Sequence, residues 1–431
     1  MFARLSMIWN RLRTGLWALP ITVVLAAFLL AVLAVSVSFD PGNVPVWWLY
    51  SGDASSASGF LANLLTAMIT MATLAVSITM VVLTLAAQSL GPRLIHIFMA
   101  DTRTKLALGL FIGTVVYLLI VLRSVVGDTE SVPNLAVTLG AVLVVTSVIV
   151  LLFFVHHLAR SIVADTIIAR VGDALDGWIP DHFPKKEAGG SDLAAIPVPP
   201  EADGRQLRVR ATGYIQVVDY EAAVDAACAA GITVALYCRP GHFMLCKDFI
   251  AWLWPPEAVD DDLEQALLET IVVGETRTPV QDIEYPIRQL VEIALRALSP
   301  GVNDPYTAVA VIDRLAGSIA AIMARGDPQS LWRDGEDVVR LIVPTTSLDG
   351  ILDAAYNEIR QAGAAQPAIL IRLVDRLGQL LAQADEGQAR AVSRHIDLVR
   401  ATGERAVADE ADRKDFLARA DAAANAGHCK G

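Results

Sequence analysis

The stretch that decides the fold is residues 61–90, LANLLTAMITMATLAVSITMVVLTLAAQSL, which is long and apolar enough to cross a bilayer as a helix. It contains no Asp, Glu, Lys or Arg. Apart from Thr79 and Ser89, its polar residues recur with a 3.5-residue period, interrupted once by Met80, so they share one helix face. These residues are Asn63, Thr66, Thr70, Thr73, Ser77, Thr84 and Gln88.

Three further segments are apolar enough to span a membrane, and with residues 61–90 they predict four transmembrane helices within residues 1–160. They lie at 17–37, 106–122 and 135–155, and none contains a charged residue. A mean hydropathy of +0.50 over 431 residues agrees with a membrane protein. Ion-coupled transporters usually carry an ionisable group at mid-membrane, so its absence disfavours ion-coupled active transport.

The flanks of the spans predict their orientation. Basic residues precede the first predicted span, lie between the second and third, and follow the fourth. Because Lys and Arg concentrate in cytoplasmic flanks, both chain termini are expected in the cytoplasm. Basic residues on this side include Arg11, Arg13, Arg103, Lys105 and Arg160.

The polar stripe of residues 61–90 has three interpretations. Several copies of this helix could line a pore or water-filled path with hydroxyls and amides. Alternatively, small and hydroxyl side chains permit close helix packing with hydrogen bonds across the contact. A Ser or Thr hydroxyl can also bond its own helix backbone and need no partner. A homo-oligomer suits the first two interpretations, since one four-helix bundle hardly encloses a conducting path.

The remainder of the chain is acidic and predicts an α+β cytoplasmic domain. Residues 1–170 hold 9 basic and 6 acidic residues, whereas the rest holds 25 and 40. This charge disfavours nucleic acid as a partner, because phosphates would be repelled. The composition divides the chain into a transmembrane domain at 1–160, an amphipathic helix and linker at 161–205, a small β-containing module at 206–256, a helical domain at 257–402 and an Ala-rich charged tail at 403–431.

Two capped helices are predicted in the middle of the cytoplasmic part. Residues 284–298 have one apolar face, and Ser299-Pro300-Gly301 ends this helix. Asp304 and Pro305 suit the N-cap and first position of the next helix.

The segment RQLVEIALRALSPGVNDPYTA at 288–308 resembles the signature of a bacterial family called "predicted membrane protein", a domain of unknown function numbered twenty-two fifty-four. GYIQVVD at 213–219, RPGHF at 239–243 and QDIEY at 281–285 are similar to it too. The resemblance covers the chain from the first span to about residue 400. It implies a bacterial inner-membrane location with several spans and no particular activity.

The signature gathers polar residues that could form a ligand site, a catalytic site or a structural network between two helices. The spacing favours the structural network, and neither a metal site nor a cofactor is expected. The sequence therefore supports two hypotheses: an oligomeric ion channel or passive pore with a cytoplasmic regulatory domain, and a membrane-anchored sensor of a small ligand or scaffold; an enzyme ranks last. The signature candidates are Asp282, Arg288, Glu292, Arg296, Asn303, Asp304 and Thr307.

Overall fold

The computed structural model describes residues 17–36, 48–90, 101–127, 132–161, 163–185 and 203–426. The chain forms two compact units, residues 1–166 and 167–431. Each unit has its own hydrophobic core. The predicted linker within 161–205 lies mostly outside the described residues.

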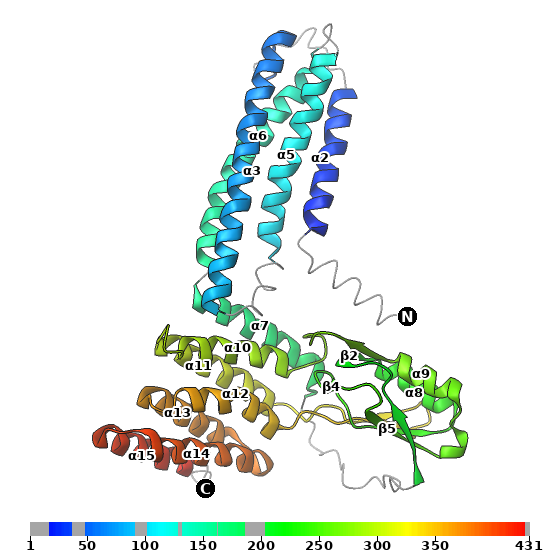
Figure 1. Ribbon diagram of the computed structural model, residues 1–431, viewed down its shortest axis with the longest axis vertical. Helices are drawn as coiled ribbons and strands as arrows, with labels where there is room; N and C mark the ends of the chain where they lie inside the picture. The colour runs from blue at the N-terminus through cyan, green and yellow to red at the C-terminus, as the bar shows by residue number, and fades with distance from the viewer. Residues whose placement is uncertain are drawn as a thin grey trace. The chain divides into compact units, whose positions relative to one another are not determined.

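The first unit contains four long helices that run side by side (Figure 1). They cover the four apolar segments predicted from the sequence. Helix α5 contacts α2, α3 and α6 and is the most buried of the four. The four helices are α2 (Ala18–Ser36), α3 (Ala54–Leu90), α5 (Thr102–Gly127) and α6 (Asn134–Ser161).

Two glycines allow α5 to approach α2 closely. A Cβ on Gly109 would lie 3.0 Å from the Val23 Cβ and 3.1 Å from the Pro20 Cα. A Cβ on Gly113 would lie 3.1 Å from the Ala27 Cβ. This GxxxG pattern brings the two backbones together, as small residues do at helix contacts in membranes.

The number of helices that could span a membrane differs from the prediction of four. Five helices in the described residues are long and apolar enough, and the fifth is α11 (Pro305–Met323). The sequence analysis assigned this segment to the cytoplasmic helical domain without counting it. Helix α11 belongs to the second unit, where it packs against α10 and α13, and its apolar side chains contribute to a protein core.

The second unit contains two sheets, with strand orders β1-β5-β3-β8-β7 and β4-β2-β6. The β-containing module predicted at 206–256 is therefore not self-contained, because β6, β7 and β8 come from later in the chain. Strand β8 pairs in parallel with β3, and the other pairs are antiparallel. The strands are β1 (Arg205–Arg208), β2 (Gly213–Val218), β3 (Thr233–Leu236), β4 (Phe243–Met244), β5 (Phe249–Trp254), β6 (Ile271–Gly274), β7 (Leu331–Arg333) and β8 (Val339–Ile342).

Helices α10 to α15 lie beside the sheets in successive layers (Figure 1). The segment predicted as an Ala-rich charged tail at 403–431 contains α15, which packs on α13 and α14. Its Phe416 is buried against Gly403, a contact that the Ala-rich composition did not reveal. The helices of this unit other than α11 are α7 (Ala164–His182), α8 (Tyr220–Ala229), α9 (Asp261–Glu269), α10 (Glu284–Ala297), α12 (Leu348–Ala362), α13 (Pro367–Gln383), α14 (Glu386–Ala406) and α15 (Glu410–Asn425).

Candidate functional site

The polar stripe of α3 lies on the side of the helix that faces away from the other helices of its unit. Every stripe residue with a described side chain is exposed, and Gln88 lies outside the residues whose side chains are described. The exposed residues are Asn63, Thr66, Thr70, Thr73, Ser77 and Thr84.

The opposite face of α3 is apolar and buried. Leu61, Met68, Ala75 and Val82 recur every seventh residue and belong to the core of the first unit. A seven-residue repeat keeps one face against its neighbours along a long helix. Within the described chain, α3 therefore packs through its apolar face and leaves its polar face uncovered.

Most stripe hydroxyls bond the backbone of their own helix. Thr66, Thr70, Thr73 and Thr84 each donate to the carbonyl oxygen four residues earlier, at 2.9–3.0 Å. These threonines need no other partner. Two members of the stripe differ: the side chains of Asn63 and Ser77 make no hydrogen bond with any residue that the structure describes.

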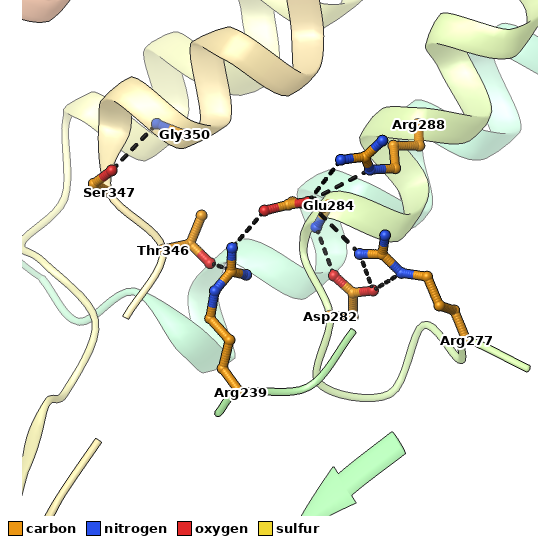
Figure 2. Close-up of polar contacts among 8 residues, drawn as sticks. All are labelled: Arg239, Arg277, Asp282, Glu284, Arg288, Thr346, Ser347 and Gly350. Atoms are coloured by element: carbon orange, nitrogen blue, oxygen red, sulfur yellow. Dashed lines mark hydrogen bonds and ion pairs between the residues drawn. The ribbon is translucent and has the colours of Figure 1, made fainter. Parts of the chain in front are cut away.

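A second candidate site joins the RPGHF and QDIEY motifs in the second unit (Figure 2). The Arg239 guanidinium donates to Glu284 at 2.6 Å and to the Thr346 hydroxyl at 2.8 Å. The Arg277 guanidinium contacts Asp282 at 2.6 Å and lies 3.6 Å from Glu284. Arg288 reaches Glu284 from the next turn of α10 at 3.2 Å. Three arginines thus surround two buried carboxylates, in what we call the arginine–carboxylate network.

The two carboxyl groups of this network have opposite pKa shifts. Asp282 is 1% exposed, and burial raises its pKa although Arg277 opposes the shift. Burial also acts on Glu284, but the hydrogen bond and charge of Arg239, together with Arg288, bring its pKa below the ordinary value. Glu284 is therefore the firmly ionised member of the pair, held by charge-assisted hydrogen bonds.

Gly241 allows the RPGH turn to lie directly against the arginine–carboxylate network. This residue has a φ of +91°, which favours glycine, and a Cβ there would collide with the Asp282 carboxylate and the Arg277 guanidinium. The neighbouring His242 is half-buried, and burial, with Arg239, lowers its pKa. The network thereby ties the turn after β3 to the start of α10 and to the segment before α12.

The remaining signature residues cap and connect two helices. The Asp304 carboxylate accepts the Thr307 backbone N–H at 3.2 Å and its hydroxyl at 2.6 Å, as expected for an N-cap. Asn303 has a φ of +48° in the preceding turn, a conformation that Asn tolerates. Glu292 and Arg296 lie further along α10 and are not drawn in Figure 2.

Sequence reasoning found Asp282 and Arg288 but missed Arg239, Arg277, Glu284 and Thr346 as members of one site. The RPGHF and QDIEY motifs contain Arg239 and Glu284 and could have indicated them. Nothing in the sequence around the other two residues indicated the contact. In the described ranges, no three His, Cys, Asp or Glu side chains gather to hold a metal ion.

The apolar helices of the first unit and the α+β second unit together fit an integral membrane protein with a further α+β domain. The chain belongs to the family described as "Predicted membrane protein (DUF2254)", whose model matches residues 13–379. It is 29% identical over 428 residues to the uncharacterized proteins Rv1290c of Mycobacterium tuberculosis and Mb1321c of Mycobacterium bovis. The alignment covers 97% of this chain and 82% of each relative. No solved structure matches the chain.

Proposed function

We propose that this protein is a homo-oligomeric passive ion path of the bacterial inner membrane, in which the polar stripes of α3 from several copies face one another. Helices α2, α3, α5 and α6 are the spans, and both termini lie in the cytoplasm with the second unit as a regulatory domain. The uncovered polar face of α3 is the observation that carries this proposal.

Exposure of the polar stripe to lipid would cost free energy, which supports contact of the stripe with water or with another protein surface. A polar group in hydrocarbon without a hydrogen-bond partner costs several kcal/mol. The threonine hydroxyls avoid this cost through their own helix, but Asn63 and Ser77 find no partner among the described residues. Water, or the same stripe on another copy, would provide one.

The absence of charge on the stripe favours passive conduction. Between Ala54 and Leu85, the part of α3 whose side chains are described, no side chain is ionisable at neutral pH. Coupling to a proton or ion gradient usually needs such a group. Hydroxyls and an amide instead offer weak, multiple sites along the path, from which an ion can leave as readily as it enters.

Helix α11 is not counted as a span because its middle carries charges with protein partners. Asp313 accepts from Arg376 at 2.8 Å, and Arg314 contacts Asp173 at 3.0 Å and Asp176 at 2.7 Å. A buried apolar helix within a domain has the same composition as a short span.

A flux assay tests the proposal. The full chain is reconstituted in liposomes, and monovalent cation flux is compared between the native protein, Thr73→Trp, Ser77→Trp and a control, Val142→Trp. Val142 is exposed on α6, so its variant adds the same bulk away from the stripe. We expect flux to fall at least about tenfold in the two stripe variants and to persist in the control. Equal flux in all four proteins, or no flux in the native protein, would contradict the proposed pore.

A membrane-anchored sensor is the second candidate function, and the arginine–carboxylate network favours it. Arg288 is 45% exposed at the edge of this network, whose three guanidiniums outnumber its two carboxylates. Such an excess suits a small anion. Inorganic phosphate should then raise the melting temperature of the detergent-solubilised full chain, and Arg288→Gln should abolish the shift. An unshifted melting temperature in the native protein would remove this candidate.

A further inference from the structure

The polar stripe of α3 is interrupted once, by a methionine. Met80 follows Ser77 by three residues and precedes Thr84 by four, where the 3.5-residue period would place a polar side chain. Its side chain is 61% exposed, so it lies on the same uncovered face as the exposed Ser77 and Thr84. The stripe therefore has one apolar position between polar ones.

The helix surface around Met80 is apolar as well. The neighbouring Val81 is 58% exposed. Thr79 lies off the stripe, and its hydroxyl donates to a carbonyl of its own helix at 2.7 Å. Between Ser77 and Thr84, about 10 Å along the helix axis at 1.5 Å per residue, the uncovered face thus offers no hydrogen-bonding side chain.

The other end of the stripe has a polar side chain at every turn. Asn63, Thr66, Thr70 and Thr73 follow one another at intervals of three or four residues, and all are exposed. In a path lined by this stripe, water and ions would pass from one polar partner to the next. At Met80 one partner in that series is missing.

We propose that Met80 is the hydrophobic gate of the path lined by the α3 stripes. This inference rests on the proposed function, because several copies of α3 must bring their Met80 side chains together at one level. A ring of apolar side chains in a narrow path expels water and thereby stops ions. Methionine is unbranched and flexible, so such a ring opens through side-chain rotation without movement of the helix backbone.

The depth of Met80 places the gate nearer one end of the span. Met80 follows Asn63 by 17 residues, which is about 25 Å of the roughly 38 Å between Asn63 and Gln88. With both termini in the cytoplasm, α3 runs from the outer to the inner side of the membrane. The closed gate would therefore lie in the cytoplasmic half and leave the outer part of the path hydrated.

Flux measurements on variants of matched size test the proposal. Met80→Gln replaces the thioether by an amide of nearly the same length, and Met80→Leu keeps an apolar side chain. Val81→Thr is the matched control, because it adds a hydroxyl at the same depth but about 100° around the helix. The full-length proteins are reconstituted in liposomes in equal amounts, with Thr73→Trp as the blocked reference, and monovalent cation flux is measured.

We expect Met80→Gln to raise the flux at least about tenfold over the native protein, because the amides let water fill the constriction. Met80→Leu and Val81→Thr should stay within about twofold of the native flux. Light scattering in detergent checks that Met80→Gln keeps the native oligomeric state. If it does not, Met80→Ser gives the same comparison with a residue type that the stripe already contains.

Three results would overturn the gate. Native flux that Thr73→Trp blocks and Met80→Gln leaves unchanged would remove the gate but keep the pore. An equal rise in Met80→Leu or Val81→Thr would show that polarity at position 80 does not control the flux. No flux in the native protein would contradict the pore and the gate together.

Discussion

Helices α3 and α5 have similar apolar composition but occupy different environments within the same unit. In the most apolar 18-residue stretch of α5, 56% of the residues are buried, and this helix contacts α2, α3 and α6. In the corresponding stretch of α3, 17% are buried. In α5 the small residues Gly109 and Gly113 face a neighbouring helix. In α3 the stripe residues face outward, and the fully buried residues on the opposite face are apolar.

The difference shows that polar or small residues at regular spacing do not by themselves identify a packing face. In α5 two glycines serve contact within one chain, while the buried Thr114 and Ser147 hydroxyls lie 3.3 Å apart between α5 and α6. In α3 the longer and more regular stripe is exposed at every position whose side chain is described. The polar stripe of α3, which faces away from the other helices of its unit, is therefore a better candidate for oligomerisation or conduction than the small residues of α5.

The largest expected effect comes from filling the α2–α5 contact. Gly109→Leu should lower the free energy of unfolding by about 3 kcal/mol, because its Cβ already meets Val23 and Pro20. Gly59→Leu on α3 is the matched control, since nothing lies within 4 Å of its Cβ. Melting of both variants in detergent measures the difference. Equal melting temperatures would contradict the close packing of α5.

A second comparison uses two methionines on opposite faces of α3. Met68 is 1% exposed and Met80 is 61% exposed. Met68→Ala should cost about 2 kcal/mol through lost packing, and Met80→Ala should leave a monomer almost unchanged. Denaturation in mild detergent checks both. A larger loss for Met80→Ala would show that the stripe is covered, as in an oligomer that persists in detergent.

The start of α5 should show a pH-dependent contribution from a carboxylate that contacts a neighbouring helix. Asp101 accepts from Thr104 at 2.7 Å and from His157 of α6 at 2.7 Å. Burial opposes ionisation, but these hydrogen bonds bring the pKa of Asp101 below its ordinary value of 3.8. A lowered carboxyl pKa stabilises the folded state above the ordinary value, and this stabilisation is lost as the pH falls through the lowered pKa.

Melting temperatures measured from neutral pH to pH 3 should therefore fall less for Asp101→Asn than for the native protein. The amide keeps the helix cap but has no charge, whereas Asp101→Ala should also lose about 1 kcal/mol at neutral pH. Parallel pH profiles for the native protein and Asp101→Asn would contradict this contribution.

The smallest effect is expected for a stripe hydroxyl. Thr70 donates to the Thr66 carbonyl of its own helix, so Thr70→Val should change the unfolding free energy of the monomer by less than about 0.5 kcal/mol. Size-exclusion with light scattering of the same variant shows whether oligomerisation depends on the hydroxyl. A large destabilisation of the monomer would mean that the stripe packs inside the chain.

The sequence predicted the helices well because their signals are local. The apolar lengths of α2, α3, α5 and α6, the 3.5-residue period of α3, and the Asp304 and Pro305 start of α11 all follow from neighbouring residues.

Only the tertiary structure determines which segments that are far apart in the sequence contact each other. Whether the α3 stripe faces into or out of the bundle depends on which face meets α5, and both faces have the same helical period. Strand β8 reaches β3 across about a hundred residues. Arg239 and Arg277 reach two carboxylates from separate turns, and the Thr346 hydroxyl accepts from Arg239. Contacts of this kind depend on packing between elements, which a local pattern does not specify.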